Sequence, residues 1–258
     1  MPRFSANLSM LFTEVDFLDR FKQAAKAGFE AVEFLFPYGW QPEQLADALR
    51  RNGLKQVLHN LPAGKWEAGE RGIAGLPDRI DEFKAGVERA IRYARALGCP
   101  RLNCLAGIVP SGVRPALFRK TLVKNLRFAA AALEKENIQL LVESLNTKDV
   151  PGFYLSRTAD AMALLEEVDH PNVWLQYDIY HMQIMEGNLI QTIQTHLPRI
   201  AHMQLADVPG RHEPGSGEIN FSNLFRSIDQ IGYAGWIGCE YIPSRRTEET
   251  FEFIKANK

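Results

Sequence analysis

Oxygen-bearing side chains end four consecutive apolar segments in the second half of this 258-residue chain. The segments QLLVE, VWLQYD, IAHMQ and WIGCE end at Glu143, Asp178, Gln204 and Glu240. One acidic residue after a strand is more often a helix cap or a surface charge, but several buried carboxylates in succession are costly unless they are paired or bind a cation. Because these ligands are oxygens without a thiolate, we predict a divalent metal site that suits Mg²⁺ or Mn²⁺ better than zinc.

The same side chains suit proton transfer at a carbon next to a carbonyl group. One carboxylate removes the α-proton, the second delivers a proton to the neighbouring carbon, and a metal with nearby donors stabilises the enediolate between them. We therefore predict that Glu143 and Glu240 are the acid/base pair, with Asp178 and Gln204 as positioning metal ligands. The order of the two proton transfers is left open.

A barrel of parallel strands would bring these positions together. Short β-rich apolar runs alternate along the chain with longer segments whose apolar residues have helical spacing. The eight expected strands are Phe4–Asn7, Phe29–Phe34, Lys55–His59, Arg101–Leu105, Gln139–Ser144, Val173–Tyr177, Ile200–Leu205 and Trp236–Cys239. The expected helices are Val15–Ala27, Pro42–Asn52, Asp78–Leu97, Pro115–Glu136, Thr158–Val168, Asn188–Leu197, Phe221–Ile231 and Glu248–Ala256.

Eight strand–helix units favour an α/β fold, a closed (β/α)₈ TIM barrel that forms a single domain over residues 1–258. In such a barrel the carboxyl ends of the strands face one common mouth. The alternative, a doubly wound open sheet, would need a glycine-rich phosphate turn after its first strand, where the chain reads NLSMLFTE. Two long loops, residues 60–77 and 206–220, follow the third and seventh strands and are expected to line the mouth.

The composition restricts the class of partner. The formal net charge is −1, from 30 basic and 31 acidic residues, so no global field attracts a nucleic acid or an anionic membrane surface. Three scattered cysteines form neither a disulfide framework nor a CxxC metal site, which fits a reducing compartment. The sequence has no amino-terminal signal and no apolar run near the roughly 20 residues that span a bilayer. We expect a soluble cytoplasmic protein, with the oligomeric state left open.

The strings LLVESLN, QYDIYHMQ, HMQLADVPGRHEPGSGEIN and GWIGCEY resemble those of hydroxypyruvate isomerases and their close relatives, within the xylose-isomerase-like barrel superfamily. The resemblance covers nearly the whole chain and starts at FSANLSMLF. It implies that Glu143 and Glu240 are the catalytic glutamates, and that both also bind the metal together with Asp178 and Gln204. Related sugar epimerases carry a histidine at the third metal position, so Gln204 indicates the hydroxypyruvate branch.

The resemblance also implies a short sugar-acid substrate. Hydroxypyruvate would be converted to tartronate semialdehyde, or a four-carbon 2-oxo-tetronate to its 3-oxo isomer, and we rank the two nearly level. Both substrates carry a carboxylate, which predicts cationic partners in the mouth. The candidates are His59, which would end the third strand facing the mouth, His181, three residues after Asp178, and the loop cations Lys65, Arg71 and Arg211. His202 is expected to be a core histidine rather than a ligand.

The sequence also bears on three alternative functions of such a barrel. A metal-dependent ketose 3-epimerase is the alternative within the same superfamily. A zinc endonuclease acting on damaged DNA would need several clustered histidines and a basic surface, whereas this chain has six scattered histidines and almost no net charge. A non-catalytic sugar-binding barrel would need no facing pair of carboxylates, which disfavours it.

Overall fold

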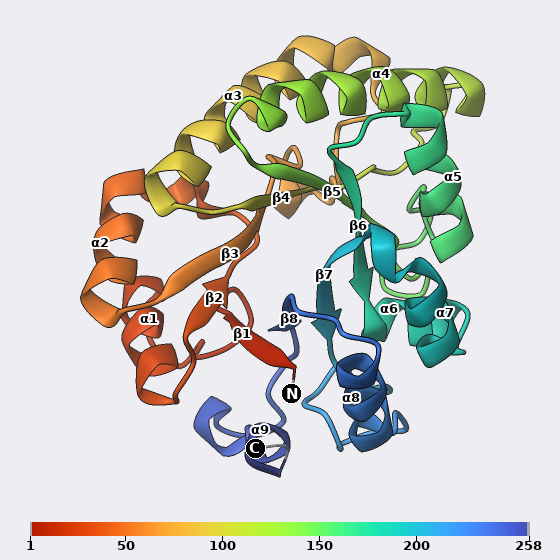
Figure 1. The fold of residues 1–258 in the computed structure, drawn as a ribbon. Helices are drawn as coiled ribbons and strands as arrows, with labels where there is room; N and C mark the ends of the chain where they lie inside the picture. The colour runs from red at the N-terminus through yellow and green to blue at the C-terminus, as the bar shows by residue number, and fades with distance from the viewer. Residues whose placement is uncertain (1, 257–258) are drawn as a thin grey trace.

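The computed structural model describes residues 2–256 and confirms the closed barrel of parallel strands. The strands follow one another in chain order, and the last pairs with the first (Figure 1). They are β1 Arg3–Asn7, β2 Ala31–Glu33, β3 Lys55–Asn60, β4 Arg101–Cys104, β5 Gln139–Glu143, β6 Val173–Asp178, β7 Ile200–Leu205 and β8 Trp236–Cys239. All eight lie where the sequence predicts strands, and β2 is the one that is clearly shorter than expected.

Helices surround the strands as an outer ring (Figure 1). They are α1 Phe17–Lys26, α2 Pro42–Asn52, α3 Ile80–Leu97, α4 Pro115–Glu134, α5 Thr158–Val168, α6 Ile179–Met185, α7 Leu189–His196, α8 Phe221–Gln230 and α9 Glu252–Ala256. No helix of the described part of the chain has the length and apolarity needed to cross a membrane.

Local sequence signals account for the helix ends. Helix α2 has Pro42 in its first turn, and Gln41 and Gln44 form a reciprocal capping box at its start. It ends at Gly53, whose left-handed conformation at φ 64° suits a residue without a Cβ atom. Leu45 and Leu49, four residues apart, then face the barrel and are buried.

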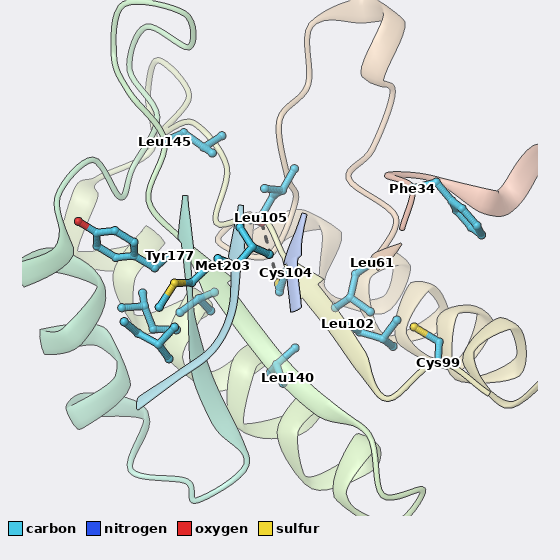
Figure 2. Close-up of a cluster of buried hydrophobic side chains, with 14 of the residues drawn as sticks. Phe34, Leu61, Cys99, Leu102, Cys104, Leu105, Leu140, Leu145, Tyr177 and Met203 are labelled. Carbon is cyan, nitrogen blue, oxygen red and sulfur yellow. Dashed lines mark hydrogen bonds between the residues drawn. The ribbon is translucent and has the colours of Figure 1, made fainter. Parts of the chain in front are cut away.

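The main apolar core lies between the strands and the helices. Figure 2 shows part of it, with Leu102 of β4 beside Cys99 and with Leu140 on the neighbouring β5. Full burial of each such leucine contributes about 2 kcal/mol. A smaller apolar cluster contains Ala31, Val57, Leu58, Leu141 and Trp236. Its members come from β2 and β3, which are neighbours, and from β5 and β8 on other sides of the barrel, so this cluster fills the interior.

The strand register decides which side chains enter the barrel. Asn103 of β4 donates to Glu143 of the adjacent strand β5 inside the barrel, so Asn60, its partner on β3, also lies on an inward position. His59 pairs with Leu102, which packs in the outer core. The expectation that His59 faces the mouth is therefore not met. Strand β3 extends to Asn60, one residue beyond the predicted end, and a shift of one residue reverses the side to which a side chain points.

Helix α6 is absent from the sequence prediction. It begins directly after β6, where the carboxylate of Asp178 accepts hydrogen bonds from the backbone N–H groups of Tyr180 and His181. The helix has only seven residues, too few for its apolar spacing to be distinguished from the end of the strand. The last predicted helix, Glu248–Ala256, is a 3₁₀ turn at Thr247–Glu249 followed by α9.

The environment of His59 predicts a specific pH dependence of stability. Its ring packs near Phe34 and Tyr38, and its nitrogens make no hydrogen bond of good geometry to a described residue, although the Ala90 backbone interacts with the ring. Burial lowers the pKa of His59 to about 3. As pH falls below the ordinary histidine pKa of about 6.5, the unfolded chain binds a proton that the native state does not. Each further pH unit therefore lowers the free energy of unfolding by up to about 1.4 kcal/mol.

We therefore expect His59→Leu to be at least as stable as the wild type at neutral pH and to lose less stability on acidification. Urea unfolding at a series of pH values would measure this, and the difference between the two proteins isolates His59 from the other histidines. Equal slopes for the two proteins below pH 6.5 would show that His59 is not buried in its neutral form.

Candidate active site

The structure brings together the four residues that the sequence places at strand ends. Glu143 ends β5, Asp178 ends β6, Gln204 lies in β7, and Glu240 follows β8. Asp178 pairs in register with Gln204, and Gln204 with Gly238, so these positions share the inward side of the sheet. All four side chains are buried.

Glu143 carries a carboxyl group that resists ionisation. Its Oε2 accepts a hydrogen bond of 2.8 Å from Nδ2 of Asn103. Burial raises the pKa of Glu143 well above its usual value, and the charges of Asp178 and Glu240 raise it further. At neutral pH this carboxyl group therefore tends to hold a proton.

Glu240 is held at both of its oxygens. Nη2 of Arg211 lies 2.6 Å from Oε1, while Nδ2 of Asn7 and Nε2 of Gln204 donate to Oε2 at 2.8 and 2.5 Å. Burial raises the pKa of Glu240, the Arg211 guanidinium opposes this, and the charge of Asp178 adds to it. Glu143 and Glu240 thus both have raised pKa values, as acid/base groups that work near neutral pH require.

His181 is oriented by Asn146, which the sequence interpretation did not consider. Its Nδ1 accepts the backbone N–H of Asn146 at 3.1 Å and lies 2.7 Å from the side-chain nitrogen of the same residue. A backbone N–H can only donate, so the proton of the neutral ring is on Nε2, which lies 3.6 Å from Oδ2 of Asp178. Burial lowers the pKa of His181 to about 4, so the ring is a neutral hydrogen-bond donor.

Arg211 enters the mouth because its loop is rigidly held. The buried carboxylate of Asp207 accepts hydrogen bonds from the backbone N–H groups of Val208, Gly215, Gly217 and Ile219. The Arg211 carbonyl accepts the Ile242 N–H at 2.7 Å, which ties this loop to the segment after β8. The guanidinium stacks 5.0 Å from the ring centroid of Tyr180 and lies 3.9 Å from Asp178 as well as beside Glu240.

The other predicted cations are not part of this cluster. Arg71 lies over the Trp66 ring at 4.0 Å and donates to the carbonyl groups of Trp66 and Glu70. The Lys65 side chain is exposed on the same loop. Within the described structure, neither makes a hydrogen bond or ion pair with Glu143 or Glu240. His59 lies on the outer side of β3.

A further carboxylate, Glu33, lies inside the barrel at the end of β2. It accepts a hydrogen bond of 2.8 Å from His202, which is fully buried, as expected for a core histidine. Gln204 also donates to Glu33, at 2.7 Å, so Glu33 is connected to the site. The signal was present in the sequence, because the run FEAVEF places an acidic residue at the end of the second predicted strand.

The carboxylates fit a divalent cation. The charge of buried Asp178 raises the pKa of both Glu143 and Glu240, and a cation would neutralise this excess of negative charge. Potential ligand atoms of Glu143, Asp178 and His181 lie within 4.8 Å of one another. If His181 bound the cation through Nε2, its proton would move to Nδ1, where it would face the N–H of Asn146. The histidine is therefore better suited to donate a hydrogen bond from Nε2 than to bind a cation. Glu143 and Asp178 are therefore the residues of this group that fit, and ligation by Glu240 stays a prediction.

Gln204 presents its amide group in the orientation opposite to that of a ligand. Its oxygen accepts from Nε2 of Gln176 at 2.6 Å, and its nitrogen faces Glu33 and Glu240. Binding a cation through the oxygen would require the amide to turn by half a rotation, with loss of both donations to carboxylates. Ligation by Gln204 stays a prediction.

Comparison with known proteins agrees with this fold. The sequence matches the xylose isomerase-like TIM barrel family over residues 21–257. It is 54% identical to a hydroxypyruvate isomerase of Escherichia coli over 248 residues, 96% of each chain. It is 47% identical to a 2-oxo-tetronate isomerase of Pectobacterium atrosepticum, over 96% of this chain and 95% of the relative.

Solved structures show the same architecture. A Brucella melitensis protein described as an AP endonuclease, family 2, superimposes with a TM-score of 0.97 over the full length of both chains at 44% identity. An L-ribulose 3-epimerase superimposes with a TM-score of 0.77 at 21% identity, covering 99% of this chain and 86% of its own, which shows the shared fold alone. By the sequence matches, the chain belongs to the hydroxypyruvate isomerase and 2-oxo-tetronate isomerase family of xylose isomerase-like TIM barrels, and is an isomerase.

Proposed function

We propose that the protein interconverts hydroxypyruvate and tartronate semialdehyde by proton transfer through an enediolate between Glu143 and Glu240. The observation that carries this proposal is the pair of buried carboxyl groups at the mouth, each with a raised pKa. Their mutual repulsion favours a state in which one is protonated and the other ionised. One base and one acid are then present at the same time, as a 1,2-isomerisation requires.

The isomerisation removes a proton from C3 of hydroxypyruvate and adds one to C2. The ionised glutamate removes a proton from C3 of hydroxypyruvate, and the electron pair of that C–H bond forms the C2=C3 bond of the enediolate. The π electrons of the C2 carbonyl move onto its oxygen, which receives the hydroxyl proton of C3. The protonated glutamate delivers its proton to C2 as the C3 oxygen becomes the aldehyde. The two glutamates exchange protonation states in each turnover.

Neighbouring donors support the charge that develops on the substrate oxygens. His181 directs a neutral Nε2–H toward Asp178 and the mouth, and Arg211 has an Nε atom that is buried without a hydrogen-bond partner among the described residues. These two groups are placed to bind the enediolate oxygens and the substrate carboxylate. A divalent cation held by Glu143, Asp178 and Glu240, with Gln204 as the predicted fourth ligand, would supply further charge stabilisation.

Two other activities have weaker support. The sugar 3-epimerases among the structural neighbours are about one-fifth identical in sequence, for example 21% for the L-ribulose enzyme, which carries no argument about substrate. The Brucella protein is described by an endonuclease name. Here, however, the described carboxylate cluster includes one histidine, His181, and the net charge is −1, which suits neither a zinc cluster of histidines nor a DNA backbone.

Glu143→Gln and Glu240→Gln should each lower kcat by about 10²- to 10⁴-fold, the usual effect of losing a general acid or base. Circular dichroism would verify that both variants are folded. Glu218→Gln is the matched control, because Glu218 is an exposed loop carboxylate that accepts a hydrogen bond from Gln183. This variant should keep normal turnover.

The wild-type reaction in D₂O should place deuterium on the carbon that receives the proton. Near-native turnover of either site variant, or complete retention of substrate hydrogen, would refute the two-glutamate mechanism.

A turnover screen tests the substrate. Hydroxypyruvate should have a higher kcat/KM than four-carbon 2-oxo sugar acids, measured with and without a chelator. The four-carbon acids are the second candidate because relatives named 2-oxo-tetronate isomerase are 47% and 45% identical to this chain. A higher kcat/KM for the four-carbon acids would assign the protein to that activity instead.

Cation binding should depend on pH in a definite direction. In the metal-free protein the raised pKa values of Glu143 and Glu240 mean that the native state holds protons that the unfolded chain releases as pH rises. The metal-free protein should therefore lose stability toward alkaline pH, and Mg²⁺ or Mn²⁺ should raise Tm more at about pH 8 than at about pH 5. Thermal unfolding would measure this, with Asp178→Asn as the variant expected to lose the effect. A cation-induced shift that is absent, or equal at both pH values, would contradict the site.

A further inference from the structure

A cavity lies at the amino-terminal end of the barrel, opposite the mouth. It is lined by side chains from the first two residues of four neighbouring strands, β4 to β7, and from the segment before β8: Arg101, Gln139, Trp174, Ile200 and Tyr233. Its volume is about 400 Å³. Small-molecule sites usually have about 300–1,000 Å³, mostly apolar walls and a few polar groups. None of the residues that line this cavity belongs to the candidate active site.

One side of the cavity is polar. Arg101 and Gln139 are register partners on the adjacent strands β4 and β5. Arg101 lies two residues before Asn103, whose side chain enters the barrel, so both partners share the inward side of the sheet. Neighbouring strands are about 4.8 Å apart, which lets one group of a ligand contact both side chains.

Arg101 is a partly buried cation without an acidic partner. Among the described residues its side chain has no hydrogen bond or ion pair, and its Nε atom is shielded from solvent. Arg3 is nearby and also lacks a carboxylate, since it donates to the Ala234 carbonyl and stacks 4.7 Å from the ring centroid of Trp236. Burial raises the pKa of Tyr233, and the charges of Arg101 and Arg3 oppose this. This end of the barrel therefore carries positive charge that an anion can neutralise.

The opposite side of the cavity is aromatic and is held in place by the chain itself. Trp174 packs against the small interior cluster that contains Trp236. The Tyr233 hydroxyl donates a hydrogen bond of 2.9 Å to the Trp236 carbonyl. A Cβ atom at position 235 would lie 2.3 Å from the Tyr233 hydroxyl oxygen, so Gly235 leaves the space that this ring occupies. Two aromatic walls are thus fixed beside an unpaired guanidinium.

We propose that this cavity binds an organic carboxylate with a flat apolar body. The carboxylate pairs with the guanidinium of Arg101 and accepts a hydrogen bond from the Gln139 amide, while the apolar body packs against Trp174 and Tyr233. An inorganic oxyanion leaves the aromatic walls uncovered, and a neutral aromatic compound leaves Arg101 unpaired. The site is independent of the proposed isomerase reaction, which takes place at the other end of the barrel.

Benzoate is the probe, because it carries both a carboxylate and a flat apolar ring. Calorimetric titration of the full-length protein should show one saturable site. Arg101→Met, which keeps the apolar stem, should weaken binding by about 10-fold or more, and Gln139→Leu should weaken it by less. Benzyl alcohol and inorganic phosphate each carry one of the two parts and should bind more weakly than benzoate. The matched control is Arg114→Met, which removes an exposed arginine before α4 that does not line the cavity and should leave the Kd unchanged.

The mouth is the other place where a carboxylate could bind. Benzoate that is lost in Arg211→Met and retained in Arg101→Met would place the anion at the mouth and overturn the proposal. Equal binding of phosphate and benzoate, or no saturable binding with a Kd below about 10 mM, would overturn it as well. Circular dichroism verifies that the variants are folded, and if Arg101→Met does not fold, the Kd of Gln139→Leu decides.

Discussion

The mouth of the barrel confines like negative charges in a space that excludes most water. Glu143, Asp178 and Glu240 face one another there, with Glu33 beneath them, and each is buried. Such an arrangement is stable only if donors or cations offset the desolvation and repulsion of the carboxylates. The surrounding polar groups are accounted for by this one constraint: the guanidinium of Arg211 and the amides of Asn7, Asn103 and Gln204 all point their hydrogens at carboxylate oxygens.

The fold could be predicted because its signals are local and repeated. Gly53, for example, ends α2 in the left-handed conformation, and the strand that follows begins two residues later at Lys55. The side to which a strand residue points is less secure, because an error of one residue at a strand end reverses it. His59 was misplaced in this way, since β3 continues to Asn60 and pairs His59 with the outward Leu102.

The sequence predicted those site residues whose side-chain type and position after a strand both indicate a role at the mouth. Glu143, Asp178 and Glu240 are carboxylates directly after apolar runs, and no packing role would place them there. The asparagines were missed because their function depends on orientation. Asn146 matters only because its N–H meets His181 across the β5 and β6 loops, and Asn103 because β4 adjoins β5. Such contacts between separate strands leave no pattern in a single sequence.

Gln204 contacts two of these carboxylates, Glu33 and Glu240. A carboxamide can both donate to a carboxylate and offer an oxygen to a cation. It donates to Glu33 and Glu240 and so offsets their charge. A histidine at this position would donate through one N–H at most toward the two carboxylates, whereas glutamine supplies two hydrogens from a single nitrogen. The choice of glutamine is therefore tied to the presence of a second carboxylate, Glu33, beneath the site.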